Sequence, residues 1–259
     1  MVVLPYKDRL ELLGKYLQQL IMESVGKEKD LDGKTVHQGL TVLGNKGSSD
    51  QHSYVQQLLD GPNNFIAAFV GVLADRDGAS IIIDDNSNCG DYLQAFMLGT
   101  RQALSQRGRP SLTLFLEKVD GLRLGALIAL FERAVTFYAF LANINAYHQP
   151  AVEMGKKSAG EIIKLKNKIV TFLQENRGIS YSTEEVAKGM GLADSGEEET
   201  IFMLLQRLSA NHHYGINARQ DAGSSLLDRR FWMQIAKTQN IKTDVSDLKS
   251  KLHKHIAEA

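Results

Sequence analysis

The chain has 259 residues, 43% of them hydrophobic, which is enough apolar material for a core in one large domain or two small ones. Its 30 basic and 30 acidic side chains cancel, which argues against nucleic acid and anionic membranes as partners, because both attract a surplus of positive charge. The single cysteine, Cys89, excludes an intramolecular disulfide and a cysteine-built zinc site. We expect it to be packed rather than catalytic, in a reducing, cytoplasmic compartment.

Up to about residue 120, apolar runs and turn residues alternate in a strand–helix rhythm that predicts a parallel α/β sheet flanked by helices. The first run, residues 2–4, has the composition of an interior strand at the very start of the chain, a pattern expected when an upstream segment is missing. Asp8 is the expected N-cap of the helix that follows. The predicted strands are residues 2–4, 35–43, 65–73, 80–83 and 111–119, and the predicted helices are residues 8–25, 51–59 and 91–105.

Beyond residue 120 the apolar period is helical almost throughout, which predicts an all-helical extension after the sheet. Residues 122–146 predict one long apolar helix, and residues 152–174 predict a second with mixed charge. The first is long enough to cross a bilayer, but Glu132 and Arg133 lie near its middle, where charge is costly in hydrocarbon. We therefore expect a buried core helix and no membrane contact.

Residues 182–211 begin with a capping-type start at Ser182 and continue into two short helices. Two short helices after a longer one resemble a winged-helix or helix-turn-helix arrangement. The second short helix opens with three glutamates at 197–199, which would repel nucleic acid, so a small helical appendix is the preferred interpretation. The predicted organisation is a domain at residues 1–150, a helical, winged-helix-like extension at residues 151–211 and a polar tail at residues 212–259.

The first candidate cluster lies in the helix predicted for residues 8–25. Gln19 and Glu23 are four residues apart, so their side chains lie one above the other on one helix face. The apolar neighbours Leu20, Ile21 and Met22 would disfavour the ionised form of the Glu23 carboxylate, as suits a general base. From the residues alone, a surface glutamate near a helix end is the simpler interpretation.

The second candidate is a histidine after a glycine-rich turn. The glycines of residues 44–50 free the backbone between a strand and a helix, and His52 falls in the first turn of that helix. An imidazole there can exchange protons near neutral pH, and the helix N-terminus favours its neutral form. A capping or loop histidine is an equally good interpretation of the residues.

The third candidate is the polar junction between the two long helices, residues 143–157. Gln149 and Lys156 are seven residues apart, two turns along one helix face, and Gly155 lets a neighbouring backbone come close. Amides at interhelical corners often satisfy helix ends. A structural role therefore has a slight preference when the residues are considered alone.

In their order and spacing, the three clusters resemble the C-terminal half of the glucose-6-phosphate isomerase family, in its plastid and cyanobacterial-type form. The resemblance is strong over residues 2–166, weaker to residue 211 and lost in the tail. It is carried by Gln19 with Met22-Glu23-Ser24, the turn from Gly44 to His52, the run from Asn145 to Lys156, Cys89-Gly90-Asp91-Tyr92-Leu93, Gly99-Thr100-Arg101 and the run from Gly125 to Val135.

The resemblance implies a three-layer sugar-isomerase (SIS-type) domain, a homodimer, and interconversion of glucose 6-phosphate and fructose 6-phosphate through a cis-enediolate, with no metal and no other cofactor. It implies that Glu23 moves a proton between C1 and C2, and that His52 assists ring opening in the site of the neighbouring subunit. Lys156 would act on the ring oxygen or hydroxyl groups. Gln149 would contact the phosphate of the sugar phosphate substrate, and Gln19 would help to bind it.

The resemblance also implies an N-terminal sugar-isomerase domain, whose phosphate loop and Gly-Gly-flanked arginine we do not find in this sequence. Ser48-Ser49 is a poor substitute for the loop, and the arginines of this chain lack the glycine context. We therefore expect the isolated chain to have little isomerase activity, acting only with the missing domain. The alternatives are a non-catalytic sugar-phosphate sensor or interaction module, and a stable α/β scaffold with an incomplete site.

Overall fold

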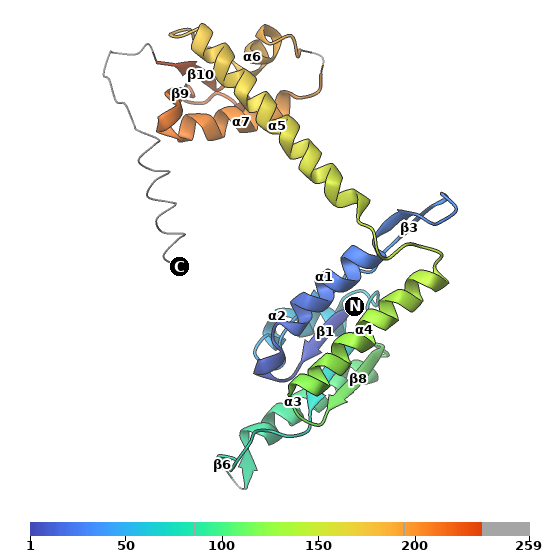
Figure 1. The fold of residues 1–259 in the computed structure, drawn as a ribbon. Coiled ribbons are helices and arrows are strands. Elements are labelled where there is room, and N and C mark those ends of the chain that lie inside the picture. Colours follow the sequence, from blue (N-terminus) through green and yellow to red (C-terminus); the bar gives the residue numbers. More distant parts are fainter. Residues whose placement is uncertain (85, 194, 235–259) are drawn as a thin grey trace, which may run out of the picture. The chain divides into compact units, whose positions relative to one another are not determined.

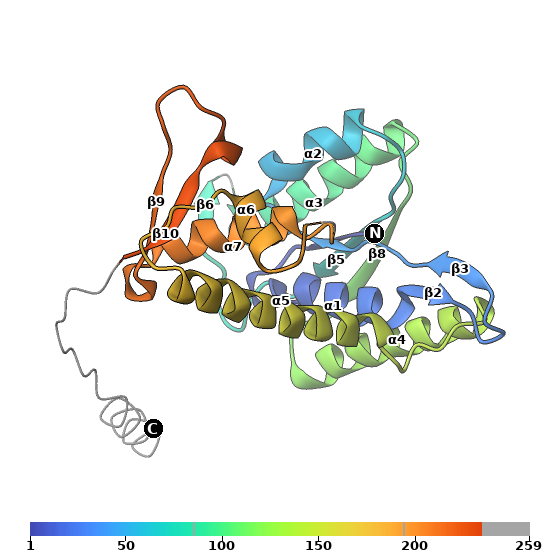
Figure 2. The ribbon, with the colours of Figure 1, turned by 90° about the horizontal axis from the view of Figure 1, so that it is seen from above.

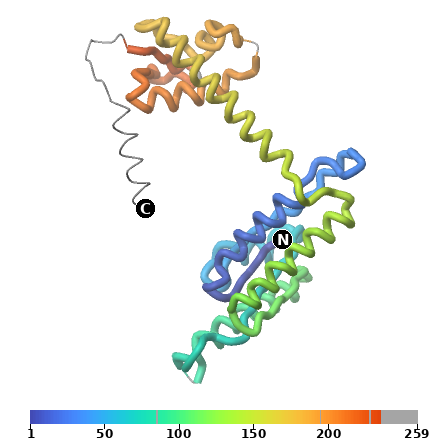
Figure 3. The backbone as a smooth tube through the Cα atoms, viewed as in Figure 1, coloured from blue at the N-terminus to red at the C-terminus, as the bar shows by residue number. Residues whose placement is uncertain are grey.

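The computed structural model describes residues 1–84, 86–193 and 195–234, and the chain divides into two compact units, Met1–Pro150 and Ala151–Ala259 (Figure 1). The backbone tube in Figure 3 runs from blue to green through the first unit and from yellow to red through the second. Each unit has its own core of buried apolar side chains.

The first unit is built on a four-stranded parallel sheet in the order β4–β1–β5–β8. The central strand β1 pairs with β5 along its whole length and is buried on both faces, as expected for a parallel strand covered by helices. The sheet confirms the predicted parallel α/β architecture. Its strands are β1 (Val2–Pro5), β4 (Leu43–Gly44), β5 (Ala67–Val72) and β8 (Ser111–Leu116).

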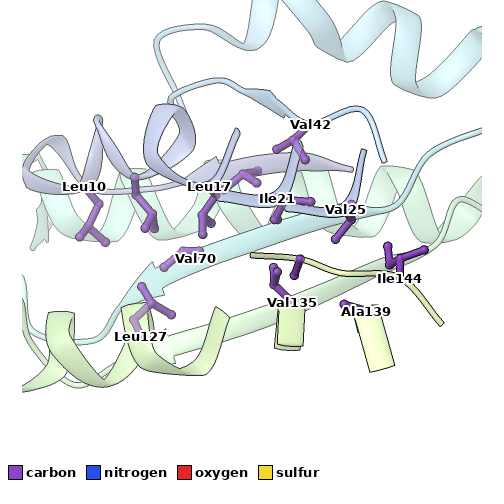
Figure 4. Close-up of a cluster of buried hydrophobic side chains, with 13 residues drawn as sticks. Leu10, Leu17, Ile21, Val25, Val42, Val70, Leu127, Val135, Ala139 and Ile144 are labelled. Atoms are coloured by element: carbon purple, nitrogen blue, oxygen red, sulfur yellow. The ribbon is translucent and has the colours of Figure 1, made fainter. Parts of the chain in front are cut away.

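Two helices cover each face of this sheet, which gives three layers. Because strand residues alternate between faces, Val3 packs in the cluster with α1 (Leu13–Val25) and α4 (Gly121–Leu141), drawn in Figure 4. Its neighbour Leu4 packs on the other face, with α2 (Gln51–Asp60) and α3 (Cys89–Gln106). Figure 2 shows α1 beside α4 and α2 beside α3.

Two predicted strands differ from expectation, because, of their residues, only Leu43, in β4, belongs to the main sheet. The segment predicted as one strand over residues 35–43 contains β3 (Thr35–Gln38), which pairs antiparallel with β2 (Lys27–Lys29) in a separate hairpin. Residues 80–83 contribute to β6 (Ile82–Asp84), which forms a second hairpin with β7 (Ser87–Asn88). Composition identified both as extended, but strand propensity does not specify which strand is the partner.

The starts of two helices also differ from expectation. Asp8 is not an N-cap, because α1 begins only at Leu13 after the 3-10 turn η1 (Asp8–Leu10), and the Asp8 carboxylate instead pairs with Lys46 at 3.2 Å. Cys89, expected to be packed, is exposed in the first turn of α3.

The long apolar helix is shorter than predicted and is not a buried core helix. α4 ends at Leu141 rather than residue 146, and Asn143 just beyond it has a positive φ of 55° that a helix does not allow. By length and composition it is the one helix of the described residues able to cross a membrane, with 17% of its apolar window buried. Its buried residues are Leu127, Val135 and Ala139, whereas Leu122, Phe137, Phe140 and Leu141 are 63–84% exposed.

The second unit combines three helices with a short antiparallel sheet. Its helices bury one apolar stripe each, and Phe231 of β10 lies among them. Tyr181 and Phe231 exchange backbone hydrogen bonds of 2.9 and 2.8 Å, which adds an isolated bridge beside β10. The elements are α5 (Pro150–Glu175), α6 (Thr183–Gly189), α7 (Glu198–Ala210), β9 (Ile216–Arg219) and β10 (Arg230–Met233).

Part of the segment assigned to a polar tail is ordered and packed. Within residues 212–234 the turn η2 (His212–Tyr214) leads into the β9–β10 hairpin, and Ile216 and Met233 are buried in the core. The extension is therefore mostly helical but ends in a hairpin. The remainder of the predicted tail, residues 235–259, lies outside the described residues.

Replacing Ser182 with alanine is expected to lower the free energy of unfolding by about 1 kcal/mol, because Ser182 and Glu185 form a reciprocal capping box at the start of α6. The Ser182 backbone N–H and then Arg230 lower the pKa of Glu185. The ionised Glu185 carboxylate therefore adds to the free energy of unfolding above pH 4.5, and this contribution is lost as the pH falls below that value. Urea unfolding at pH 7 and below pH 4 measures both effects. Ser158→Ala on the exposed face of α5 is the control, and equal losses in both variants would contradict the cap.

Candidate functional site

Two of the three candidate clusters meet at the C-terminal end of α1. Gln149 Nε2 donates a hydrogen bond of 3.1 Å to Glu23 Oε2, although the two residues are 126 positions apart in the chain. Both side chains are exposed, so the carboxylate is open to solvent rather than held against an apolar surface as expected. The contact creates a carboxylate–amide pair that an incoming ligand can reach.

The segment after α4 is tied to its surroundings, and this places Gln149. Ile144 is buried in the same cluster as Val25 at the end of α1. The Asn143 carbonyl accepts a 2.8 Å hydrogen bond from Leu31 N, and the Asn143 side chain donates one of 2.7 Å to Asp32. These bonds connect the segment to the turn of the β2–β3 hairpin.

Lys27, a residue that the sequence did not indicate as functional, holds the backbone at Glu23. Its ammonium donates hydrogen bonds of 3.0 and 2.8 Å to the carbonyls of Glu23 and Ser24, the unsatisfied acceptors of the last turn of α1. The residue is only 5% exposed, and this burial lowers the pKa of its ammonium. The sequence feature that could have indicated this role is a lysine two residues beyond the predicted end of the helix, where its side chain can reach the last carbonyls.

The other end of α1 is fixed by backbone contact. A β-carbon on Gly44 would lie 2.7 Å from the Cα of Gly14, so the first turn of the helix lies directly against the end of β4. Only glycines fit at this approach. Together with Lys27, the contact holds α1, and with it Glu23, at both ends.

The remaining two candidates, Gln19 and Lys156, stand apart from this pair for different reasons. Gln19 is exposed on α1 one turn before Glu23, and it has no side-chain hydrogen bond to another described residue. Lys156 belongs to the second unit, where its ammonium pairs with Glu153 at 2.8 Å. Gln149 precedes α5 instead of lying on it, so the predicted shared helix face with Lys156 is absent.

His52 lies in the first turn of α2, exposed, and at the opposite end of the sheet from Glu23. The neighbouring Gln51 donates hydrogen bonds of 2.9 Å to Tyr6 Oη and 2.8 Å to Thr100 Oγ1, which fixes this turn to the segment after β1 and to α3. α1 runs back from this end, and at 1.5 Å per residue Glu23 lies roughly 14 Å along its axis from Gly14. Within one chain the structure therefore does not bring His52 and Glu23 together.

Among the described ranges, no group of three or more His, Cys, Asp or Glu side chains has the geometry to hold a metal ion. The groups gathered at the end of α1 are a carboxylate, an amide and a buried ammonium. The carboxylate can exchange a proton with a ligand, the amide can hydrogen-bond ligand hydroxyl groups, and the ammonium holds the end of the helix.

Comparison with known proteins places these residues in a family context. The family model described as phosphoglucose isomerase matches residues 1–175, which include all five candidate residues. A glucose-6-phosphate isomerase of Desulfitobacterium hafniense (strain Y51) is 58% identical over 233 residues, covering 90% of this chain and 43% of the relative. One of Trichormus variabilis is 56% identical over 211 residues, covering 82% of this chain and 39% of the relative.

A solved structure gives the same result for the fold. The glucose-6-phosphate isomerase of Chlamydia trachomatis superposes with a TM-score of 0.59 at 28% identity, over 64% of this chain and 34% of that one. The chain thus spans about two fifths of the length of the curated relatives it matches, 43% of the Desulfitobacterium protein.

Proposed function

Because the chain belongs to the phosphoglucose isomerase family, we propose that it is the C-terminal half of an enzyme that interconverts glucose 6-phosphate and fructose 6-phosphate. The observation that carries this proposal is the 3.1 Å hydrogen bond between Glu23 and Gln149, because it unites two motifs that chemistry would need at one site. The sensor and scaffold alternatives have no comparable observation in their favour.

We assign the proton transfer to Glu23. In its ionised form the carboxylate removes the proton from C2 of the opened aldose and returns it to C1 through a cis-enediolate. Gln149 orients that carboxylate until substrate arrives, and its amide then turns to the sugar phosphate. Gln19, one turn away on α1, adds a second amide for substrate hydroxyl groups, and Lys156 supplies a positive charge for the ring oxygen.

We propose that an N-terminal domain, not contained in this chain, completes the site. The exposed face of α4 supports this, because contiguous apolar surface of this kind marks an interaction site. Phe137 and Phe140 alone are 63% and 83% exposed. Since Glu132 and Arg133 interrupt the same helix, we assign the covering surface to protein rather than membrane, in a cytoplasmic assembly.

We further propose that the enzyme is a homodimer in which His52 serves the site of the partner subunit. Its position at the opposite end of the sheet from Glu23 supports this arrangement. An imidazole there assists ring opening in the partner's site, whereas within its own chain it is too far from the carboxylate to share a substrate.

Mixing two inactive variants tests the shared site. With the N-terminal half of the Desulfitobacterium relative present, Glu23→Gln chains and His52→Gln chains should each form little fructose 6-phosphate. After unfolding and refolding together, they should recover about a quarter of the unsubstituted activity, because half of the random dimers are mixed and each holds one intact site. If the mixture stays as inactive as its components, His52 and Glu23 do not act across subunits.

For the second unit we propose a winged-helix-like interaction module with no nucleic-acid partner. The chain path from α5 through Tyr181, α6, α7 and the β9–β10 hairpin supports the first part. The second part is supported by exposed Glu198 and Glu199 at the start of α7 and by the ion pair between Arg230 and Glu185 at 2.8 Å. Lys156, Lys164 and Arg219 are paired with carboxylates in the same way, which reduces the positive charge that this unit offers to phosphates.

A further inference from the structure

A crevice of about 600 Å³ opens beyond the carboxyl ends of β1 and β5. Residues that follow the two strands line it, among them Lys7 and Arg9 after β1 and Asp75 and Arg76 after β5. The strands are neighbours, but the helix after β1 packs on one face of the sheet and the helix after β5 on the other. In open α/β sheets, ligands bind at such a switch point.

A smaller hollow of about 110 Å³ adjoins the crevice and shares Lys7, Arg9, Asp75 and Arg76 with it. Lys118, which follows β8, also lines the hollow but is paired with Asp120 at 3.9 Å, and Asp77 completes the charged part of the lining. Arg9 and Arg76 are exposed, and neither guanidinium has a hydrogen bond or ion pair with another residue in the described parts of the chain. Two free guanidinium groups at the edge of a small hollow suit a phosphate group.

The larger part of the crevice is lined by aromatic and apolar side chains. Tyr92, Phe96 and Phe115 line it and are 39–49% exposed, and Met97 is almost completely buried. Tyr92 Oη donates to the Asp84 carboxylate at 2.7 Å, which ties the β6–β7 hairpin to α3 as one wall of the crevice. A volume of this size with aromatic walls suits a planar heterocycle.

We propose that this crevice binds a nucleoside phosphate, with the base among Tyr92, Phe96 and Phe115 and the phosphates at Arg9 and Arg76. A sugar phosphate would satisfy the guanidinium groups but would leave the aromatic walls without a partner. The crevice shares no residue with the Glu23–Gln149 pair. The proposal therefore does not depend on the isomerase assignment.

ADP added to the full chain labelled with [methyl-¹³C]methionine tests the proposal. The Met97 methyl resonance should shift on titration, while that of Met154, 70% exposed on α5, should not. The double variant Arg9→Gln/Arg76→Gln is expected to raise the dissociation constant of ADP at least tenfold. The matched control is Arg101→Gln/Arg133→Gln, two exposed arginines outside the crevice, which should leave the constant unchanged.

Adenosine and inorganic phosphate, each added alone, complete the test. Both should bind more weakly than ADP, because each uses only one part of the crevice. The proposal is overturned if ADP leaves the Met97 resonance unmoved, if both double variants weaken ADP binding equally, or if inorganic phosphate binds as tightly as ADP. In each double variant, unshifted resonances of the other methionines verify that the variant protein is folded.

Discussion

The isolated chain is expected to form fructose 6-phosphate at least a hundredfold more slowly than the same chain mixed with the separately expressed N-terminal half of the Desulfitobacterium relative. Losing one preorganised stabiliser of developing charge costs about 2.7–4 kcal/mol, which corresponds to a factor of about 10²–10³ in rate. Losing the phosphate anchor as well removes binding energy used in the transition state. An initial-rate assay with and without the added half measures the difference.

The interface in this experiment can be tested on α4. Phe137→Glu together with Phe140→Glu should prevent rescue, because the two exposed rings are the apolar surface proposed to be covered. Glu132→Gln on the same helix, also exposed, is the matched control and should still be rescued. Turnover by the isolated chain within tenfold of the mixture would refute the requirement for a second half.

Glu23→Gln should lower kcat of the completed enzyme by about 10²–10⁴, the usual contribution of a positioned general base. KM should change little, because the amide keeps the size of the side chain and its hydrogen bond to Gln149. The control is Glu28→Gln, an exposed carboxylate five residues further along, which should leave kcat unchanged. A Glu23→Gln enzyme that retains more than a tenth of kcat would remove the carboxylate from the proton transfer.

The elements predicted best from the sequence are those whose own residues show a strand or helix pattern. β1 and β5 are short apolar runs bounded by turn residues, and α2, α3 and α5 show helical periodicity, so local pattern located each to within a few residues. The capping box at Ser182 was also visible, because its two partners are only three residues apart.

Features that depend on distant partners were not predictable in the same way. Residues 35–38 and 82–84 are extended, but only the folded chain shows that they pair in hairpins outside the main sheet. The composition of α4 indicates burial, yet more than half of its apolar side chains are exposed among the residues that the structure describes. Likewise, the motifs of Glu23 and Gln149 could be proposed separately, but their contact across 126 residues required the fold.

The fixation of α1 at both ends has a consequence for how this segment can vary. With the glycine contact at Gly44 setting where the helix starts and the Lys27 ammonium setting where it stops, the number of residues between them is constrained. One inserted residue would rotate Glu23 by about 100° and advance it by about 1.5 Å, away from Gln149. Apart from Gln19 and Glu23, point substitutions on the exposed side of α1 should therefore be tolerated, whereas insertions and deletions should not. The proposed role of Glu23 thus sets a requirement on the length of this helix as well as on the residue at position 23.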